Sequence, residues 1–91
     1  MGFNEATKNS LMKTEFIIQD SSIKFDRPSN ILEEGLLYTG ETWVKRLEKA
    51  KKYPDITAAI NDAKALQLEL PVRILTIQIN GNNIGVGIVS F

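Results

Sequence analysis

Residues 71–79, with the sequence PVRILTIQI, restrict the fold more than any other stretch, because they predict a strand inside a β-sheet. The apolar side chains of this strand alternate between its two faces, with Leu75, Ile77 and Ile79 on one and Val72 and Ile74 on the other. Apolar residues on both faces are typical of strands that are covered on both sides. The pattern therefore favours a central strand.

The residues that follow predict a hairpin. NGNN at residues 80–83 can form its turn, because Asn and Gly tolerate the positive φ that a tight turn needs. Residues 84–91 return as a second strand, in which apolar residues alternate with glycines. Ile84, Val86 and Ile88 form one face of this strand, and Gly85 and Gly87 form the other. The glycines leave room for the close approach of another backbone or a large ring.

The C-terminal strand has an unusual edge. No charged residue follows Arg73, and the last strand contains neither Lys nor Pro. An exposed edge strand normally carries one of these to block pairing with other chains. We therefore expect the edge to be covered, either by the N-terminal hairpin of the same chain or by a second copy in a two-fold homodimer.

The N-terminal half predicts three more strands. Residues 14–20 are rich in β-forming side chains, and residues 23–26 alternate Ile and Phe after a DSS turn, so the two segments predict a hairpin. Residues 29–35 predict one helical turn, capped by a serine and stopped by a glycine. Residues 36–39, LLYT, predict a third, short strand.

Two helical segments lie between these strands and the C-terminal hairpin. A short helix is predicted from Thr42 to Ala50, because Trp43, Leu47 and Ala50 recur at helical spacing. Pro54 cannot continue it, and Asp55 is a natural N-cap for a second helix. The apolar face of the second helix consists of Ile56, Ala59, Ile60, Ala63 and Leu66, while Thr57, Asn61, Asp62 and Lys64 are predicted to point away.

These segments together predict an α+β protein. We expect an antiparallel sheet of about four or five strands with one principal helix packed on one face, in the order β-β-β-α-β-β. The 91 residues are enough for one domain, which we place at residues 12–91 after a polar leader at residues 1–11. The absence of cysteine fits a cytoplasmic location, and we expect no membrane contact, because no apolar run approaches the ~18 residues that span a bilayer.

The residue types favour binding over catalysis. The chain has no histidine and no cysteine, which removes the usual general base, the thiolate nucleophile and nearly all zinc chemistry. The serines therefore lack a histidine to activate them, and the acidic residues show no Asp-x-Asp metal pattern. We expect no enzymatic activity, no catalytic residue, no bound metal and no cofactor.

The basic segment, residues 45–52, is the best candidate for a partner-binding surface. Its sequence KRLEKAKK has five basic residues and one acidic residue, whereas the whole chain has 11 of each. The candidate binding residues are Lys45, Arg46, Lys49, Lys51 and Lys52, with Tyr53 and Tyr38 as neighbouring aromatics. Two interpretations stay open: a surface for an acidic partner, including weak contact with RNA or DNA, or simply the solvated face of a helix.

Residues 36–79 resemble a pattern in small phage and mobile-element proteins. In those proteins a strand ending in an aromatic residue precedes a Trp, and Ala-Lys-x-aromatic then leads into an alanine-bearing helix. The matching residues are Trp43, Leu47, Ala50, Tyr53 and Ala59. The resemblance implies a phage-encoded protein in the host cytoplasm that binds and modulates a host protein or complex. A nucleic-acid-associated module and a structural or assembly subunit are the alternatives.

Overall fold

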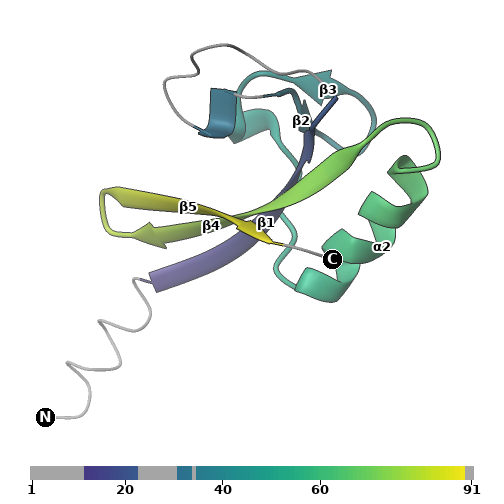
Figure 1. The fold of residues 1–91 in the computed structure, drawn as a ribbon. Helices are drawn as coiled ribbons and strands as arrows, with labels where there is room; N and C mark the ends of the chain where they lie inside the picture. Colours follow the sequence, from purple (N-terminus) through teal and green to yellow (C-terminus); the bar gives the residue numbers. More distant parts are fainter. Residues whose placement is uncertain (1–11, 23–30, 34, 90–91) are drawn as a thin grey trace, which may run out of the picture.

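A five-stranded antiparallel sheet with strand order β3-β2-β1-β4-β5 forms the centre of the computed structural model, which describes residues 12–22, 31–33 and 35–89 (Figure 1). In chain order the elements are β1 (Met12–Asp20), the 3₁₀ turn η1 (Ile31–Glu33), β2 (Leu37–Tyr38), β3 (Trp43–Val44), the 3₁₀ turn η2 (Leu47–Lys49), helix α2 (Ile56–Leu66), β4 (Val72–Asn80) and β5 (Asn83–Val89). This arrangement confirms the predicted α+β class and the order β-β-β-α-β-β.

Strands β1 and β4 form the middle of the sheet. They pair along their whole length, from Met12 opposite Asn80 to Asp20 opposite Val72. Successive side chains of a strand point to opposite faces, so this ladder supplies apolar residues to both sides of the sheet. The central position predicted for residues 71–79 is confirmed.

Each face of the sheet therefore has its own core. The fully buried residues on the helix side include Ile18, Ile74, Ala59 and Ala63, with Tyr53 and Val72 almost as deeply buried. The buried residues on the opposite side are Ile17, Leu37, Ala50, Leu75 and Ile77, against which η1 and η2 pack with Ile31, Leu32 and Leu47. One layer is thus a helix, and the other is made of short turns.

Helix α2 lies close to the sheet because the residues facing the sheet are small. Ala59 and Ala63 have no exposed surface, and Ile56, Ile60 and Leu66 pack around them. The helix starts as predicted, since the carboxylate of Asp55 accepts a hydrogen bond from the backbone N–H of Thr57 at 3.1 Å. No helix in the part of the chain that the structure describes is long and apolar enough to cross a membrane.

The predicted C-terminal hairpin is confirmed. Gly81 has φ +61°, and Asn80 and Asn83 close the turn between β4 and β5. Among the described residues β5 pairs with β4 alone, which makes β5 an edge strand of the sheet. No described atom lies within 4 Å of a Cβ added at Gly85 or Gly87, so the space that the sequence predicts beside these glycines is open.

The helix predicted from Thr42 to Ala50 is wrong. Residues 43 and 44 instead form β3, which pairs with β2, and a 3₁₀ turn follows. The cause is a tight turn at Gly40, whose φ is +103°. The hydroxyl oxygen of Thr39 accepts hydrogen bonds from the N–H groups of Glu41 and Thr42, and the N–H of Thr39 donates to the carbonyl of Thr42 at 2.9 Å. These bonds commit Thr42 to a β-turn, so it caps no helix.

Other N-terminal predictions have mixed outcomes. The strands at residues 14–20 and 36–39 are confirmed as β1 and β2, and the helical turn near residue 31 is confirmed as η1. The strand at residues 23–26, its hairpin with β1 and the leader at residues 1–11 lie outside the described residues. Within the described chain, β1 pairs with β2 and β4.

Candidate functional site

The basic segment is held at both ends by the sheet. At its start, β3 pairs with β2. At its end, the N–H of Lys51 donates to the carbonyl of Tyr38 at 2.9 Å, and Tyr53 exchanges two backbone hydrogen bonds of 2.8 Å with Phe16 of β1. Between these attachments the segment makes one 3₁₀ turn, with the buried methyl group of Ala50 beneath it. The segment is therefore a short, well-anchored projection and not a helix face.

Three cations of the segment interact with the protein itself. The ammonium of Lys51 lies 3.5 Å from the carboxylate of Asp62 and 4.9 Å from the ring centroid of Tyr53. The ammonium of Lys52 donates to the backbone carbonyl of Leu47. Arg46 lies 3.5 Å from Glu48, with both side chains largely exposed, so this pair contributes little to stability. The positive charge of the segment is thus partly neutralised by its own neighbours.

Tyr53 is a core residue in this structure. It is 3% exposed, and its hydroxyl donates a 2.6 Å hydrogen bond to Asp62. Burial, followed by the hydrogen bond and the negative charge of Asp62, raises the pKa of Tyr53 well above its usual value of about 10. The helical pattern predicts that Asp62 points away from the core. Its carboxylate instead accepts the hydrogen bond from the Tyr53 hydroxyl and pairs with the ammonium of Lys51. The ring of Tyr53 is an anchor for the segment and offers little surface to a partner.

This arrangement predicts a pH-dependent effect of Tyr53→Phe. At neutral pH the variant loses a hydrogen bond to a carboxylate and should be less stable by about 1–2 kcal/mol. Above about pH 10 the unfolded wild type releases the phenolic proton while the folded protein retains it, so the stability of the wild type falls. Chemical denaturation between pH 7 and pH 11 should therefore show the two proteins converging above pH 10. A stability difference that stays constant with pH would contradict this account.

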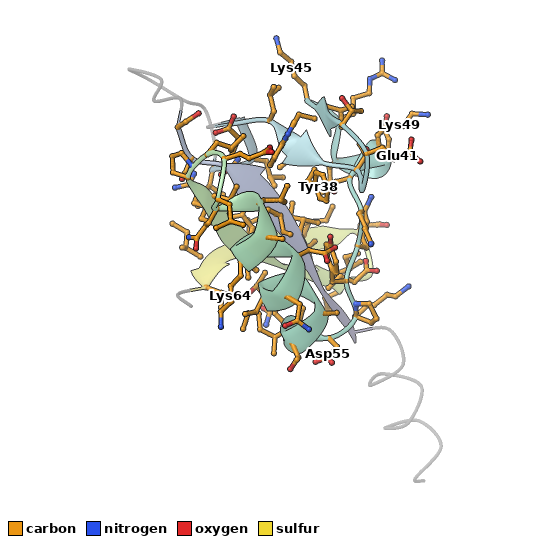
Figure 2. The ribbon with its side chains drawn as sticks, turned by 90° about the vertical axis from the view of Figure 1, so that its right-hand side faces the viewer. Tyr38, Glu41, Lys45, Lys49, Asp55 and Lys64 are labelled. Carbon is orange, nitrogen blue, oxygen red and sulfur yellow. The ribbon has the colours of Figure 1, made fainter. Side chains whose placement is uncertain are left out.

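What we call the β3–η2 surface consists of the exposed side chains of Lys45, Arg46 and Lys49 and the half-buried aromatic pair Tyr38 and Trp43. Lys45 and Lys49 extend from the end of the molecule where β2 and β3 lie, on which Glu41 also lies, whereas Lys64 is on α2 (Figure 2). Tyr38 and Trp43 are half-buried, with ring centroids 5.2 Å apart and planes tilted by 48°. The hydroxyl of Tyr38 donates to the carbonyl of Gly40 at 3.0 Å, which fixes the ring beside the β2–β3 turn.

The structure thus separates the predicted binding residues into two groups. Lys45, Arg46 and Lys49 are exposed on the segment from β3 to η2, and Tyr38 is half-buried against the helix-side core, whereas Lys51, Lys52 and Tyr53 line a shallow depression of about 350 Å³ beside the start of α2. Asp62 and Trp43 are the residues that the sequence-based site omitted. Asp62 is 11 residues from Lys51 in the chain, so no local pattern could connect them. The sequence favoured a core position for Trp43, with a half-exposed contact residue as the alternative.

The chemistry of these groups is suited to recognition. A half-buried, tilted aromatic pair and three exposed cationic side chains in the same short stretch of chain offer apolar contact, cation–π contact and hydrogen-bond donors. Within the described residues, no group of three or more acidic side chains is placed to hold a metal ion. Comparison with family models, curated proteins and solved structures finds no match for this chain.

Proposed function

We propose that this protein is a non-enzymatic binding protein that engages another protein through the β3–η2 surface. The observation that supports the proposal most strongly is the ring contact of Tyr38 and Trp43 in an anchored stretch of chain that also exposes Lys45, Arg46 and Lys49. Tyr, Trp and Arg are enriched at the centres of protein interfaces. A surface that is already held in place loses little conformational entropy when it binds.

The resemblance to small phage and mobile-element proteins favours a particular kind of partner. On that basis we propose a phage-encoded protein whose target is a host protein or complex in the cytoplasm, which it modulates by binding. The cationic rim favours a partner with an acidic surface, since opposite charges speed association and orient the encounter.

Nucleic acid is the second candidate partner, and the charge distribution gives it less support. Proteins that bind DNA through its backbone typically contact about 6–10 phosphates. On the β3–η2 surface Lys45, Arg46 and Lys49 are accompanied by two exposed carboxylates, Glu41 and Glu48. A surface of this kind could contact only about two or three phosphates, which predicts weak binding with a shallow salt dependence.

Capture from a bacterial lysate, with and without nuclease, tests the proposal. The immobilised wild-type protein should retain a protein partner after nuclease treatment. Replacing Lys45→Gln together with Lys49→Gln should reduce capture at least about tenfold and weaken its dependence on salt. Folding should be nearly unchanged, because both side chains are exposed.

A matched control separates the surface from the overall charge. Lys13→Gln together with Lys64→Gln changes the net charge by the same amount at two exposed positions away from β3 and η2. This variant should capture the partner as well as the wild type does. Equal capture by all three proteins would mean that the β3–η2 surface is only a solvated face. Loss of all capture after nuclease would favour the nucleic-acid alternative.

A further inference from the structure

The outer edge of β5 has the features of a self-pairing strand. Among the described residues it is an edge that no other strand covers. No charged residue occurs after Arg73, so two copies of this edge would approach without charge repulsion. Ile84 and Ile88 are 55% and 58% exposed, although both are large and apolar.

The order of residues in β5 is symmetric about Val86. Read in either direction, residues 84–88 have the same sequence, Ile-Gly-Val-Gly-Ile. A two-fold axis brings together the same patch of two copies, so residue i of one meets residue j of the other and the reverse. An antiparallel pair centred on Val86 would thus place each isoleucine opposite an isoleucine and each glycine opposite a glycine.

The backbone of β5 is in the correct phase for this pairing. Antiparallel pairs alternate between those that exchange both backbone hydrogen bonds and those that exchange none. In a hairpin with a two-residue turn, the pair that closes the turn is bonded. Asn80 and Asn83 close this turn, so the alternation directs the N–H and C=O groups of Ile84, Val86 and Ile88 away from β4. These three residues are the ones that the symmetric pairing would bond.

We propose that the protein forms a two-fold dimer in which β5 pairs antiparallel with β5 of a second copy, with Val86 opposite Val86. The pairing forms about six backbone hydrogen bonds and extends the sheet across both copies. The isoleucines continue the apolar row of β4, since Ile84, Val86 and Ile88 lie opposite Ile79, Ile77 and Leu75. Strand pairing alone buries less than a standard interface, so the dimer should dissociate in the micromolar range.

The dimer would also affect binding, a consequence that rests on the proposed function. Strands β3 and β5 are at opposite edges of the sheet, so a β5–β5 dimer carries its two β3–η2 surfaces at its two far ends. Such a molecule is bivalent toward a partner with repeated sites. The dimer itself does not depend on this use, because its formation is measured on the isolated protein.

Sedimentation equilibrium over a concentration series tests the dimer and its register. The wild type should change from 10.2 kDa to twice that mass as its concentration rises through the micromolar range. Ile84→Lys with Ile88→Lys puts like charges opposite each other twice and should weaken association at least about tenfold. Ile84→Lys with Ile88→Glu puts opposite charges there and should restore most of it. The two positions are about 14 Å apart along one strand, so they do not pair within a copy.

Cysteine pairing gives an independent measure of the register, because the natural chain has no cysteine. Val86→Cys lies opposite itself at about 5.5 Å between Cα atoms and should form a disulfide-linked dimer on mild oxidation. Ile84→Cys lies about 14 Å from its own copy and should not, whereas a mixture of Ile84→Cys and Ile88→Cys should. The control Leu68→Lys, at an 87% exposed residue outside the sheet, should leave the dimer unchanged.

Several results would overturn the proposal. A wild-type mass of 10.2 kDa at every concentration would show that β5 does not pair with a second copy. Equal association of the Lys/Lys and Lys/Glu variants would exclude this register, as would disulfide formation that is equally efficient at positions 84 and 86. None of these results would affect the capture test of the β3–η2 surface, because that test compares variants of a different edge of the sheet.

Discussion

Replacing Ala63 with aspartate should unfold most of the protein. Ala63 has no exposed surface and packs in the helix-side core with Ile18, Val72 and Ile74. An unpaired carboxylate in such a place costs about 3–5 kcal/mol, and the extra volume adds about 1–3 kcal/mol. A domain of this length has roughly 5–14 kcal/mol of stability. Circular dichroism should show a large loss of structure or a melting temperature far below that of the wild type.

The same substitution on the exposed side of α2 is the control. Ala58 is on the same helix, and it is exposed to solvent. Ala58→Asp buries no charge and lies in the first turn of the helix, where an acidic side chain is tolerated well, so it should cost within about 1 kcal/mol. If the two variants melted at similar temperatures, the face of α2 that contacts the sheet would be wrongly assigned.

Gly35→Ala should be the most damaging conservative substitution. A Cβ at Gly35 would lie 1.9 Å from the carbonyl oxygen of Asp20 and 3.2 Å from the Gln19 side chain. This oxygen lies at the end of β1. The same residue is held in place by a 2.8 Å hydrogen bond from its backbone N–H to the carbonyl of Leu36. One of the two backbones has to move, which should cost about 3 kcal/mol. Thermal unfolding should shift down by about 12–24 °C.

Gly85→Ala is the matched control for this prediction. No described atom lies within 4 Å of the added Cβ, and Gly85 does not have positive φ. The substitution reduces the freedom of the unfolded chain and should leave the melting temperature unchanged or slightly higher. A Gly35→Ala variant as stable as Gly85→Ala would contradict the close packing of residues 35 and 20.

The elements with strong periodicity could be predicted from the sequence. β4 carries apolar residues on both faces, and α2 has an aspartate cap directly after Pro54 and an apolar row in register. In each case several local signals favour the same secondary structure, and the tertiary contacts of the folded protein agree with it. The central position of β4 and the β4–β5 hairpin followed from the same signals.

Residues 42–50 could not be predicted correctly, because spacing alone is ambiguous over a short stretch. Helical spacing predicted that Trp43, Leu47 and Ala50 face one core, but Trp43 packs against the helix-side core, whereas Leu47 and Ala50 pack in the core on the opposite face of the sheet. The contrary signal was local. Thr39-Gly40 favours a tight turn, and Trp43 and Val44 are an aromatic and a β-branched residue that favour a strand.

The candidate site could be predicted only in part, because contacts between distant residues decide which side chains are exposed. Net charge identified the segment, but long-range contacts decide which cations are available. The carboxylate of Asp62 on α2 accepts hydrogen bonds from the side chains of Lys51 and Tyr53, and the ammonium of Lys52 donates to the carbonyl of Leu47. Lys45, Arg46 and Lys49 are exposed, in the same stretch of chain as an aromatic pair that the β2–β3 hairpin brings together.

Hydrogen–deuterium exchange of the captured complex, followed by mass spectrometry, tests the central claim most directly. The claim is that the partner binds the β3–η2 surface. Exchange should slow in peptides covering residues 41–50 when the partner is bound and stay unchanged in peptides covering α2. A complex in which residues 41–50 exchange as fast as in the free protein, while α2 or another surface becomes protected, would contradict the account.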